Sequence, residues 1–226
     1  MLLAKGLHMN FFNNKITRTI RQFIWVLLAD FFLMFGGGVY AASLADTPPD
    51  NSKSRFTHVS VSDSKIDSCV LDHTTGLMWE IKTADGGLRD WNKRYSNFDN
   101  AAAGQFWTGS DWVNPTQAQI DAPSNSVGFK NSVNTQGLCG FHDWRLPTLE
   151  ELQSILDTSR ATSRSSTPTL TIDANWFPNT QVAAYWSATP GTDNPTSAWY
   201  VYFGKGGTFK TIRPYNYFVR LIRGNR

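Results

Sequence analysis

The sequence predicts an α+β fold, and two observations lead to that expectation. Two helical patterns lie in the middle of the chain, at residues 126–134 and 147–157. Short apolar runs typical of strands lie before them, at 69–81, and after them, between 184 and 223. Strands at both ends of a helical middle are typical of α+β proteins rather than of alternating α/β folds, so we expect the first and last strands to pair.

The start of the chain, residues 1–41, has the pattern of a secretory signal peptide. Basic residues precede an almost wholly apolar run, Phe23–Phe35, and Val39–Ala41 gives a small-x-small cleavage site. The apolar run is short for a membrane-spanning helix and contains Asp30, so cleavage is favoured over a retained anchor. The protein is therefore expected to be secreted, periplasmic or at the cell surface, without stable membrane insertion after cleavage.

The charge of the chain changes once this segment is removed. The whole chain has a formal net charge of +3, and residues 1–41 hold four basic residues and one acidic residue. The rest therefore has no net charge, which argues against nucleic acid as a partner. After Val201, however, every charged residue is basic, and such a strip is a candidate site for an anionic partner, although it also suits solvated strand faces and a basic tail. These basic residues are Lys205, Lys210, Arg213, Arg220, Arg223 and Arg226.

The segment that follows the signal peptide, residues 42–66, is rich in Ser, Asp, Pro, Asn and Lys. This composition predicts a flexible linker or arm. The folded domain is expected to span residues 67–226, which is enough chain for one hydrophobic core. It begins with a hairpin, because the apolar runs Cys69–Asp72 and Gly76–Ile81 flank the turn sequence His73–Gly76.

The middle of the domain is expected to be helical. A helix is expected within Asp90–Ala103, whereas Trp107–Ala122 shows no assignable pattern. Residues at helical spacing within Ser126–Asn134, followed by Gly137 as a C-terminal stop, indicate a second helix.

The helix over Pro147–Asp157 has the clearest start signal. Thr148 is its N-cap and Glu151 follows three residues later, so the two form a capping box in which each side chain satisfies the other's backbone N–H. The apolar residues that follow recur at spacings of three and four and face the core. The remaining strands are expected at 184–188, 197–203, 208–212 and 217–223, with a tight turn at Gly204–Gly207.

The chain has only two cysteines, Cys69 and Cys139. In an exported protein such a pair is most often a disulfide. It would close a loop of about 70 residues and stabilise the fold by roughly 4 kcal/mol in the chain-entropy model. The alternative, a catalytic thiol, needs a reducing compartment, which export argues against.

Several short motifs occur in order along the domain: Gly76–Trp79, Gly137–Gly140, Asp143–Thr148, Phe177–Thr180, Tyr185–Ser187, Ala198–Val201 and Val219–Gly224. Together they closely resemble the C-terminal domain family of the Legionella collagen-like adhesin, from about Asp67 to Gly224. That family is similar to the C-type-lectin-like superfamily. The resemblance therefore implies a C-type-lectin-like fold with two helices, short antiparallel sheets, paired termini and a long loop region that carries binding.

The run Asp143–Thr148 resembles a structural signature of this family. It implies that Trp144 and Leu146 fill the core, that Arg145 pairs or stacks to hold the helix entry, and that Asp143 caps local backbone N–H groups. His142 is given no role. Short motifs of the calcium-dependent lectins are absent, and the two cysteines occupy framework positions, so no metal, cofactor or enzymatic activity is expected.

Members of the adhesin family bind sulfated glycosaminoglycans, so the resemblance implies an adhesin-like module that recognises an anionic polysaccharide. Sulfates suit Lys and Arg through charge-assisted hydrogen bonds, and aromatic faces suit sugar rings. The expected ligand-binding residues are Lys205, Lys210, Arg213, Tyr215, Asn216 and Tyr217.

Two other functions stay open, and an enzyme ranks behind them. Similar domains also serve as display scaffolds diversified by retroelements, with a protein ligand and variable residues near Arg213–Phe218. A structural envelope or pilus-associated module would have no ligand. The chain has no collagen-like stalk, so the resemblance does not imply an oligomeric state.

Overall fold

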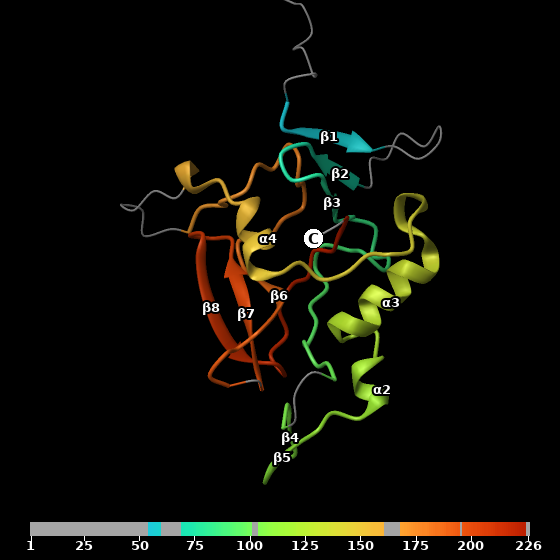
Figure 1. Ribbon diagram of the computed structural model, residues 1–226, viewed down its shortest axis with the longest axis vertical. Helices are drawn as coiled ribbons and strands as arrows, with labels where there is room; N and C mark the ends of the chain where they lie inside the picture. Colours follow the sequence, from blue (N-terminus) through green and yellow to red (C-terminus); the bar gives the residue numbers. More distant parts are fainter. Residues whose placement is uncertain (1–53, 60–68, 101–103, 161–167, 195, 225–226) are drawn as a thin grey trace, which may run out of the picture. The chain divides into compact units, whose positions relative to one another are not determined.

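The computed structural model describes residues 54–59, 69–100, 104–160, 168–194 and 196–224 (Figure 1). These residues belong to one unit, Pro49–Arg226. The expected signal peptide and most of the expected linker lie outside the described residues. Within the described part, no helix is both long enough and apolar enough to cross a membrane.

A four-stranded antiparallel sheet joins the beginning and the end of the domain. In spatial order its strands are β1 (Phe56–Val59), β2 (Cys69–Asp72), β3 (Leu77–Glu80) and β9 (Ile222–Arg223). β2 and β3 form the expected hairpin, whose turn ends at Gly76 with a φ of 71°. The last strand pairs with β3, the second strand of this hairpin, rather than with the first strand, but the two ends of the domain do share one sheet.

The strand β1 was not predicted from the sequence. It falls within residues 42–66, which were expected to be a flexible linker. The strand pairs along its whole length with β2. Phe56 is buried, and its ring meets the ring of Phe177 edge-on at 5.4 Å between centroids. Phe56 and Val59, which packs against the second core cluster, are enough to fix this strand, because the sheet supplies backbone partners as well.

A second antiparallel sheet has the order β6 (Ala184–Pro190), β7 (Ser197–Tyr202) and β8 (Gly207–Ile212). The three strands and the tight turn between β7 and β8 were expected. Residues 217–223 were expected as one strand but form only single bridges before β9 begins. The reason is that Tyr217, Phe218 and Ile222 pair with three different segments, so no continuous partner strand exists.

The described part contains three α-helices: α2 (Gln117–Ile120), α3 (Ser126–Gln136) and α4 (Leu149–Ser154). Short 3-10 turns follow α3 and α4, at η2 (Leu138–Gly140) and η3 (Thr158–Arg160). α3 ends as expected at Gly137, which adopts the left-handed conformation with a φ of 71°. The capping box of α4 is also confirmed, since the Glu151 N–H donates to Thr148 Oγ1 and the Thr148 N–H donates to Glu151 Oε2.

The helix expected within Asp90–Ala103 is wrong for residues 90–100, which the structure describes as turns and single bridges. Their backbone N–H groups are used elsewhere: Trp91 donates to the Thr83 carbonyl, Tyr95 to Tyr217 and Asn97 to Arg213. The unassigned stretch after it contains α2 and a small hairpin. The hairpin strands are β4 (Phe106–Trp107) and β5 (Trp112–Val113).

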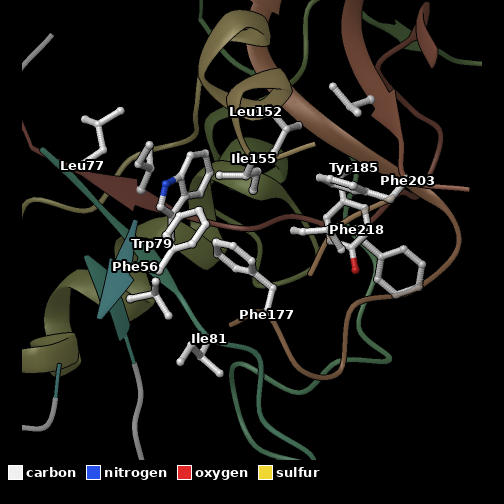
Figure 2. Packing of buried hydrophobic residues seen from close by; sticks show 14 residues of the cluster. Phe56, Leu77, Trp79, Ile81, Leu152, Ile155, Phe177, Tyr185, Phe203 and Phe218 are labelled. Carbon is white, nitrogen blue, oxygen red and sulfur yellow. The ribbon is translucent and has the colours of Figure 1, made fainter. Parts of the chain in front are cut away.

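The hydrophobic core consists of two clusters. The first lies among the four-stranded sheet, α4 and the three-stranded sheet, and Figure 2 shows Phe177 beside Phe56 and Trp79 in it. The second surrounds α3 and the Asp143–Thr148 run. Its members are Cys69, Met78, Tyr95, Phe129, Val133, Leu138, Trp144, Leu146, Trp186, Ala198, Val219 and Leu221.

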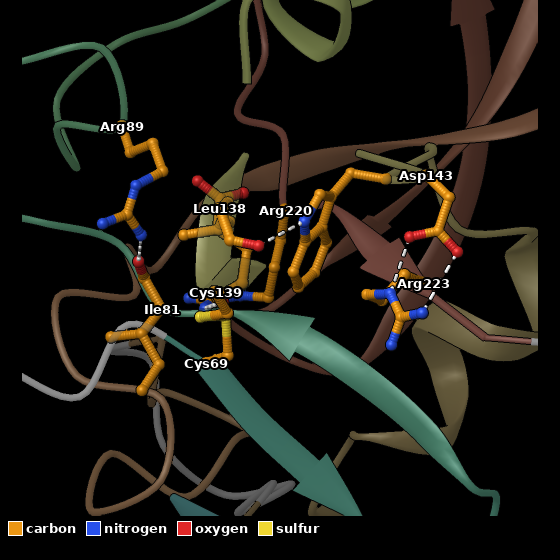
Figure 3. The surroundings of a disulfide bond; sticks show 10 residues. Cys69, Ile81, Arg89, Leu138, Cys139, Asp143, Arg220 and Arg223 are labelled. Carbon is orange, nitrogen blue, oxygen red and sulfur yellow. Dashed lines mark hydrogen bonds and ion pairs between the residues drawn. A yellow bond between two sulfur atoms is a disulfide. The ribbon is translucent and has the colours of Figure 1, made fainter. Parts of the chain in front are cut away.

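A disulfide joins Cys69 in β2 to Cys139 in η2, as expected (Figure 3). Cys69 is fully buried, and Cys139 has a positive φ of 53°. The bridge therefore ties the first hairpin to the end of α3. The loop between the two residues spans a sequence separation of 70, for which the chain-entropy model gives roughly 4 kcal/mol of stabilisation.

In the Asp143–Thr148 run, Trp144 and Arg145 make contacts inside the protein. Trp144 is 1% exposed and its Nε1–H donates to the Leu138 carbonyl at 3.0 Å. Arg145 holds the helix entry through two hydrogen bonds of 2.7 Å to Glu151. Each of these contacts fixes the start of α4 against the core.

Asp143 and His142 have partners that the sequence did not indicate. The expected role of Asp143, capping local backbone N–H groups, is corrected by an ion pair in which Arg223 Nε donates to Asp143 Oδ1 at 2.7 Å (Figure 3). This hydrogen bond lowers the pKa of Asp143. His142, which was given no role, has its Nδ1 2.5 Å from the Asn134 carbonyl oxygen at the end of α3.

Candidate binding site

The expected basic strip after Val201 is largely neutralised by acidic residues from other parts of the chain. Arg213 differs most from the expected exposed cation, since its side chain is only 1% exposed. Its Nη1 donates to Asp99 Oδ2 at 2.7 Å and to the Asn97 carbonyl at 2.8 Å. Arg213 was expected to bind a ligand. That expectation is wrong in this structure, because the guanidinium is enclosed and already hydrogen-bonded.

The other basic residues of this strip divide between the framework and the surface. Arg220 is buried and donates to the Glu80 carbonyl and to Thr180 Oγ1. On the surface, Lys210 forms an ion pair with Asp193 and lies 5.9 Å from the centre of the Trp199 ring. Lys205 is exposed in the turn between β7 and β8. Of the basic residues expected in the site, only these two lysines remain at the surface.

The other three residues of the expected site, Tyr215, Asn216 and Tyr217, all lie at the surface and line pockets. Asn216 and Tyr217 line a pocket of about 310 Å³, which we call the tyrosine pocket. Its walls come from Arg94, from the start of β6 and the two residues before it, from β7 and from the residues before β9. The lining residues are Arg94, Val182, Ala183, Ala184, Tyr200, Tyr202, Asn216, Tyr217 and Phe218.

Tyr215 belongs to a second and larger pocket of about 580 Å³, which we call the tryptophan pocket. The β4–β5 hairpin forms one wall, and Trp107 and Trp112 lie directly opposite each other on its two strands. Their side chains remain 46% and 43% exposed, and their ring centres are 5.5 Å apart. The pocket is lined by Phe106, Trp107, Trp112, Ile212, Pro214 and Tyr215.

A pair of stacked tyrosine rings connects the two pockets. The Tyr215 and Tyr217 rings are nearly parallel, with an angle of 8° and a centroid distance of 6.2 Å. Tyr217 is held from behind by Trp186 and Tyr200, each with its ring centre 4.8 Å away. Burial raises the pKa of Tyr217, and the neighbouring Tyr200 and Tyr215 add to the shift, so its hydroxyl stays protonated.

Arg94 is the cation of the tyrosine pocket, and the sequence gave it no role. Its side chain is exposed, and its guanidinium carbon lies 5.0 Å from the centre of the Phe218 ring. It forms no ion pair with any residue in the described part of the chain. The available signal was a pair of basic residues, Lys93 and Arg94, next to Tyr95, but the segment was expected to be a helix.

The chemistry of the two pockets suits binding. A guanidinium, a carboxamide and tyrosine hydroxyls can donate hydrogen bonds to an anion, while the ring faces offer flat apolar surfaces. Among the described residues, no three His, Cys, Asp or Glu side chains gather in a way that could hold a metal ion.

Comparison with known proteins gives one result. A family model described as the Lcl C-terminal domain matches residues 68–223, and this range contains every lining residue of both pockets. Neither a search of curated proteins nor a search of solved structures returned a match.

Proposed function

Because this chain belongs to the Lcl C-terminal domain family, a family of adhesin-like modules, we propose that it binds an anionic polysaccharide outside the cell or at its surface. The family is adhesin-like and non-catalytic, which agrees with binding of an external ligand rather than with turnover. The proposal has three specific parts. The ligand is an anionic polysaccharide, its site is the tyrosine pocket, and residues 1–41 direct export of the chain.

Arg94 in the tyrosine pocket is the observation that carries the proposal. A guanidinium without an ionic partner in the described part of the chain can give a charge-assisted hydrogen bond to a sulfate or carboxylate. Asn216 and Tyr217 line the same pocket and add neutral donors, while the ring of Tyr217 offers a face to a sugar. An acidic sugar residue therefore finds both an ionic partner and an aromatic contact here.

The surface lysines extend this attraction beyond the pocket. Lys205 follows Tyr202, whose ring lines the tyrosine pocket, by only three residues. Lys210 is partly neutralised, since its hydrogen bond lowers the pKa of Asp193 and keeps that carboxylate charged. Exposed charges attract weakly and are screened by salt, so the affinity should be modest and should fall steeply as the salt concentration rises.

Heparin chromatography of the exported protein tests the proposal. The wild-type protein should be retained at low salt, and Arg94→Ala should elute at a clearly lower salt concentration. Lys130→Ala is the matched control, because Lys130 is a cation on α3 that lines neither pocket. Flow-through of the wild-type protein at low salt, or elution of Arg94→Ala together with wild type, contradicts the proposed site.

A protein-binding display scaffold is the second candidate function. The segment Arg213–Phe218, where variable residues were expected, contributes to the lining of both pockets, and Tyr215 is 53% exposed. A near-copy of the 3′ coding end beside a reverse transcriptase gene would favour this candidate over the polysaccharide.

We also propose that the fold is C-type-lectin-like. The pairing of β9 with the first hairpin, the helices α3 and α4 between the two ends, and the separate sheet β6–β8 support this assignment. An experimental structure that superimposes on a C-type lectin over these elements would test it.

A further inference from the structure

The tryptophan pocket offers no ionic partner to an anion, because none of its lining side chains carries a charge. Four of its six lining residues are aromatic. Trp107, Trp112 and Tyr215 together keep large apolar faces exposed, and a contiguous exposed apolar patch on a folded domain usually marks an interaction site. The pocket therefore needs an occupant of a different chemistry from that of Arg94.

The hairpin that carries the tryptophans is anchored rather than loose. The ring of Phe106 meets the buried ring of Phe98 at 5.8 Å between centroids. Gln105, next to it, is fully buried and donates to Asp99 Oδ1 at 3.0 Å. Asp99 also accepts the hydrogen bond from Arg213, so one carboxylate connects the base of the hairpin to the residue before Pro214.

This network gives the buried Arg213 a positioning role. Arg213 directly precedes Pro214 and Tyr215, which form the wall opposite the hairpin. By holding Asp99 and the Asn97 carbonyl, it fixes the two walls of the tryptophan pocket relative to each other. A pre-formed pocket loses little conformational entropy when a ligand enters.

We propose that the tryptophan pocket is a second sugar subsite, which stacks the apolar face of an uncharged sugar residue next to the acidic residue held at Arg94. This inference rests on the proposed function. The occupant follows from three observations: flat ring faces line the pocket, charged groups are absent from its lining, and the stacked Tyr215 and Tyr217 rings connect it to the tyrosine pocket. The ligand class is therefore a polysaccharide in which acidic and uncharged residues are neighbours.

Three hexasaccharide probes separate this inference from the proposed function. Hyaluronan hexasaccharide alternates acidic and uncharged residues, heparin hexasaccharide is charged throughout, and cellohexaose is uncharged. Binding to the exported protein is measured by calorimetry. The wild-type protein should bind the first two probes, and cellohexaose should bind more weakly than hyaluronan hexasaccharide because it leaves Arg94 without a partner.

The substitutions Trp112→Ala and Arg94→Ala give the decisive comparison. Trp112→Ala should weaken hyaluronan hexasaccharide about ten-fold and heparin hexasaccharide less than about two-fold, whereas Arg94→Ala should weaken both. Trp91→Ala is the matched control, since Trp91 is a 36% exposed tryptophan that lines neither pocket. Trp112→Phe keeps a ring face and should recover part of the lost affinity. Unchanged melting curves exclude unfolding as the cause.

The outcomes are distinguishable. If Arg94→Ala weakens both charged probes and Trp112→Ala weakens neither, the proposed function stands and the second subsite is overturned. If Trp112→Ala and Trp91→Ala lower the affinity for hyaluronan hexasaccharide equally, the loss is a general effect of removing an aromatic ring, and the second subsite is overturned. If no probe binds, or if Arg94→Ala leaves binding unchanged, the proposed function fails, and the inference fails with it.

Discussion

The region around β3 and the region around Tyr215 use the same kinds of side chain in opposite ways. Beside β3, Glu80, Lys82 and Arg220 are all buried, and Lys82 Nζ lies 3.0 Å from Glu80 Oε1. Around Tyr215 the aromatic rings are exposed, and Arg94 has no ionic partner among the described residues. The presence of cations and aromatic rings therefore does not locate a binding site. What distinguishes the two regions is whether those groups already have partners inside the protein.

Glu80→Gln should give one of the largest losses of stability, because Glu80 is the buried anion beside two buried cations. Its Oε1 accepts from Lys82 and its Oε2 accepts from the Leu221 N–H. The amide removes the charge that compensates Lys82 and Arg220, and breaking a buried pair in this way costs about 3–5 kcal/mol. Urea denaturation measures the loss.

Glu151→Gln is the matched control for this prediction. Glu151 is partly exposed, and glutamine can still complete the capping box with Thr148. Its loss should stay below about 1 kcal/mol. Similar losses for the two substitutions would remove the distinction between a fully buried and a partly exposed carboxylate on which the comparison depends.

Removal of the disulfide should cost roughly 4 kcal/mol, because the loop it closes no longer restricts the unfolded chain. The double substitution Cys69→Ser with Cys139→Ser tests this by chemical denaturation. Peptide mapping, without reduction, of protein expressed in the periplasm should show the two cysteines linked. Two free thiols there would contradict the bridge and reopen the thiol chemistry that export argued against.

Local signals in the sequence predicted most of the fold. The capping box of α4, the turn before β3 and the stop at Gly137 each depend on residues within about one turn of each other. They were all found correctly. The segment of residues 90–100 was missed because its backbone N–H groups donate to distant carbonyls, at Thr83, Arg213 and Tyr217. No local pattern records those partners.

Only part of the candidate site was predicted, again because the sequence does not show which distant residues become partners. Tyr215, Asn216 and Tyr217 were chosen because they follow the basic hairpin and because aromatic faces suit sugar rings, and all three line a pocket. Arg213 was misjudged because its partner, Asp99, is 114 residues away along the chain. The sequence gives the charge of a residue but not the partner that neutralises it.

The stability of the domain should rise with pH between about 8 and 10. Burial lowers the pKa of the Lys82 ammonium to about 8 from 10.5, although Glu80 opposes the shift. In this interval the unfolded chain binds more protons than the folded chain, so raising the pH favours the folded state. Burial raises the pKa of Tyr95, so stability should fall again above about pH 10, where only the unfolded tyrosine loses its proton.

Lys82→Met provides the control for the pH profile. The substitution keeps an unbranched side chain over the Phe129 ring, where the Lys82 ammonium lies 4.4 Å from the ring centre. Denaturation midpoints measured at several pH values should lose the rise but keep the fall. A rise that persists in this variant would assign the effect to another group.

Thr148→Ala should cost about 1 kcal/mol, because the N–H of Glu151 loses its acceptor at the start of α4. The effect is small because Arg145 still binds Glu151 and Leu152 stays in the core. Thr148→Ser keeps the hydroxyl and should restore most of the stability. Equal losses in both variants would show that packing of the threonine methyl group, rather than the cap, is responsible.

Trp112→Ala should have the smallest effect, a change of less than about 0.5 kcal/mol in the free energy of unfolding. Its ring is 43% exposed and contacts Trp107 on the same hairpin rather than either core cluster. Trp144→Ala is the opposite case, since that ring is 1% exposed within the core, and its loss should cost roughly 3–5 kcal/mol. Thermal and urea denaturation of the two variants measure the contrast directly. A large loss for Trp112→Ala would make the hairpin part of the core, and its exposed rings would then be there for stability rather than for a ligand.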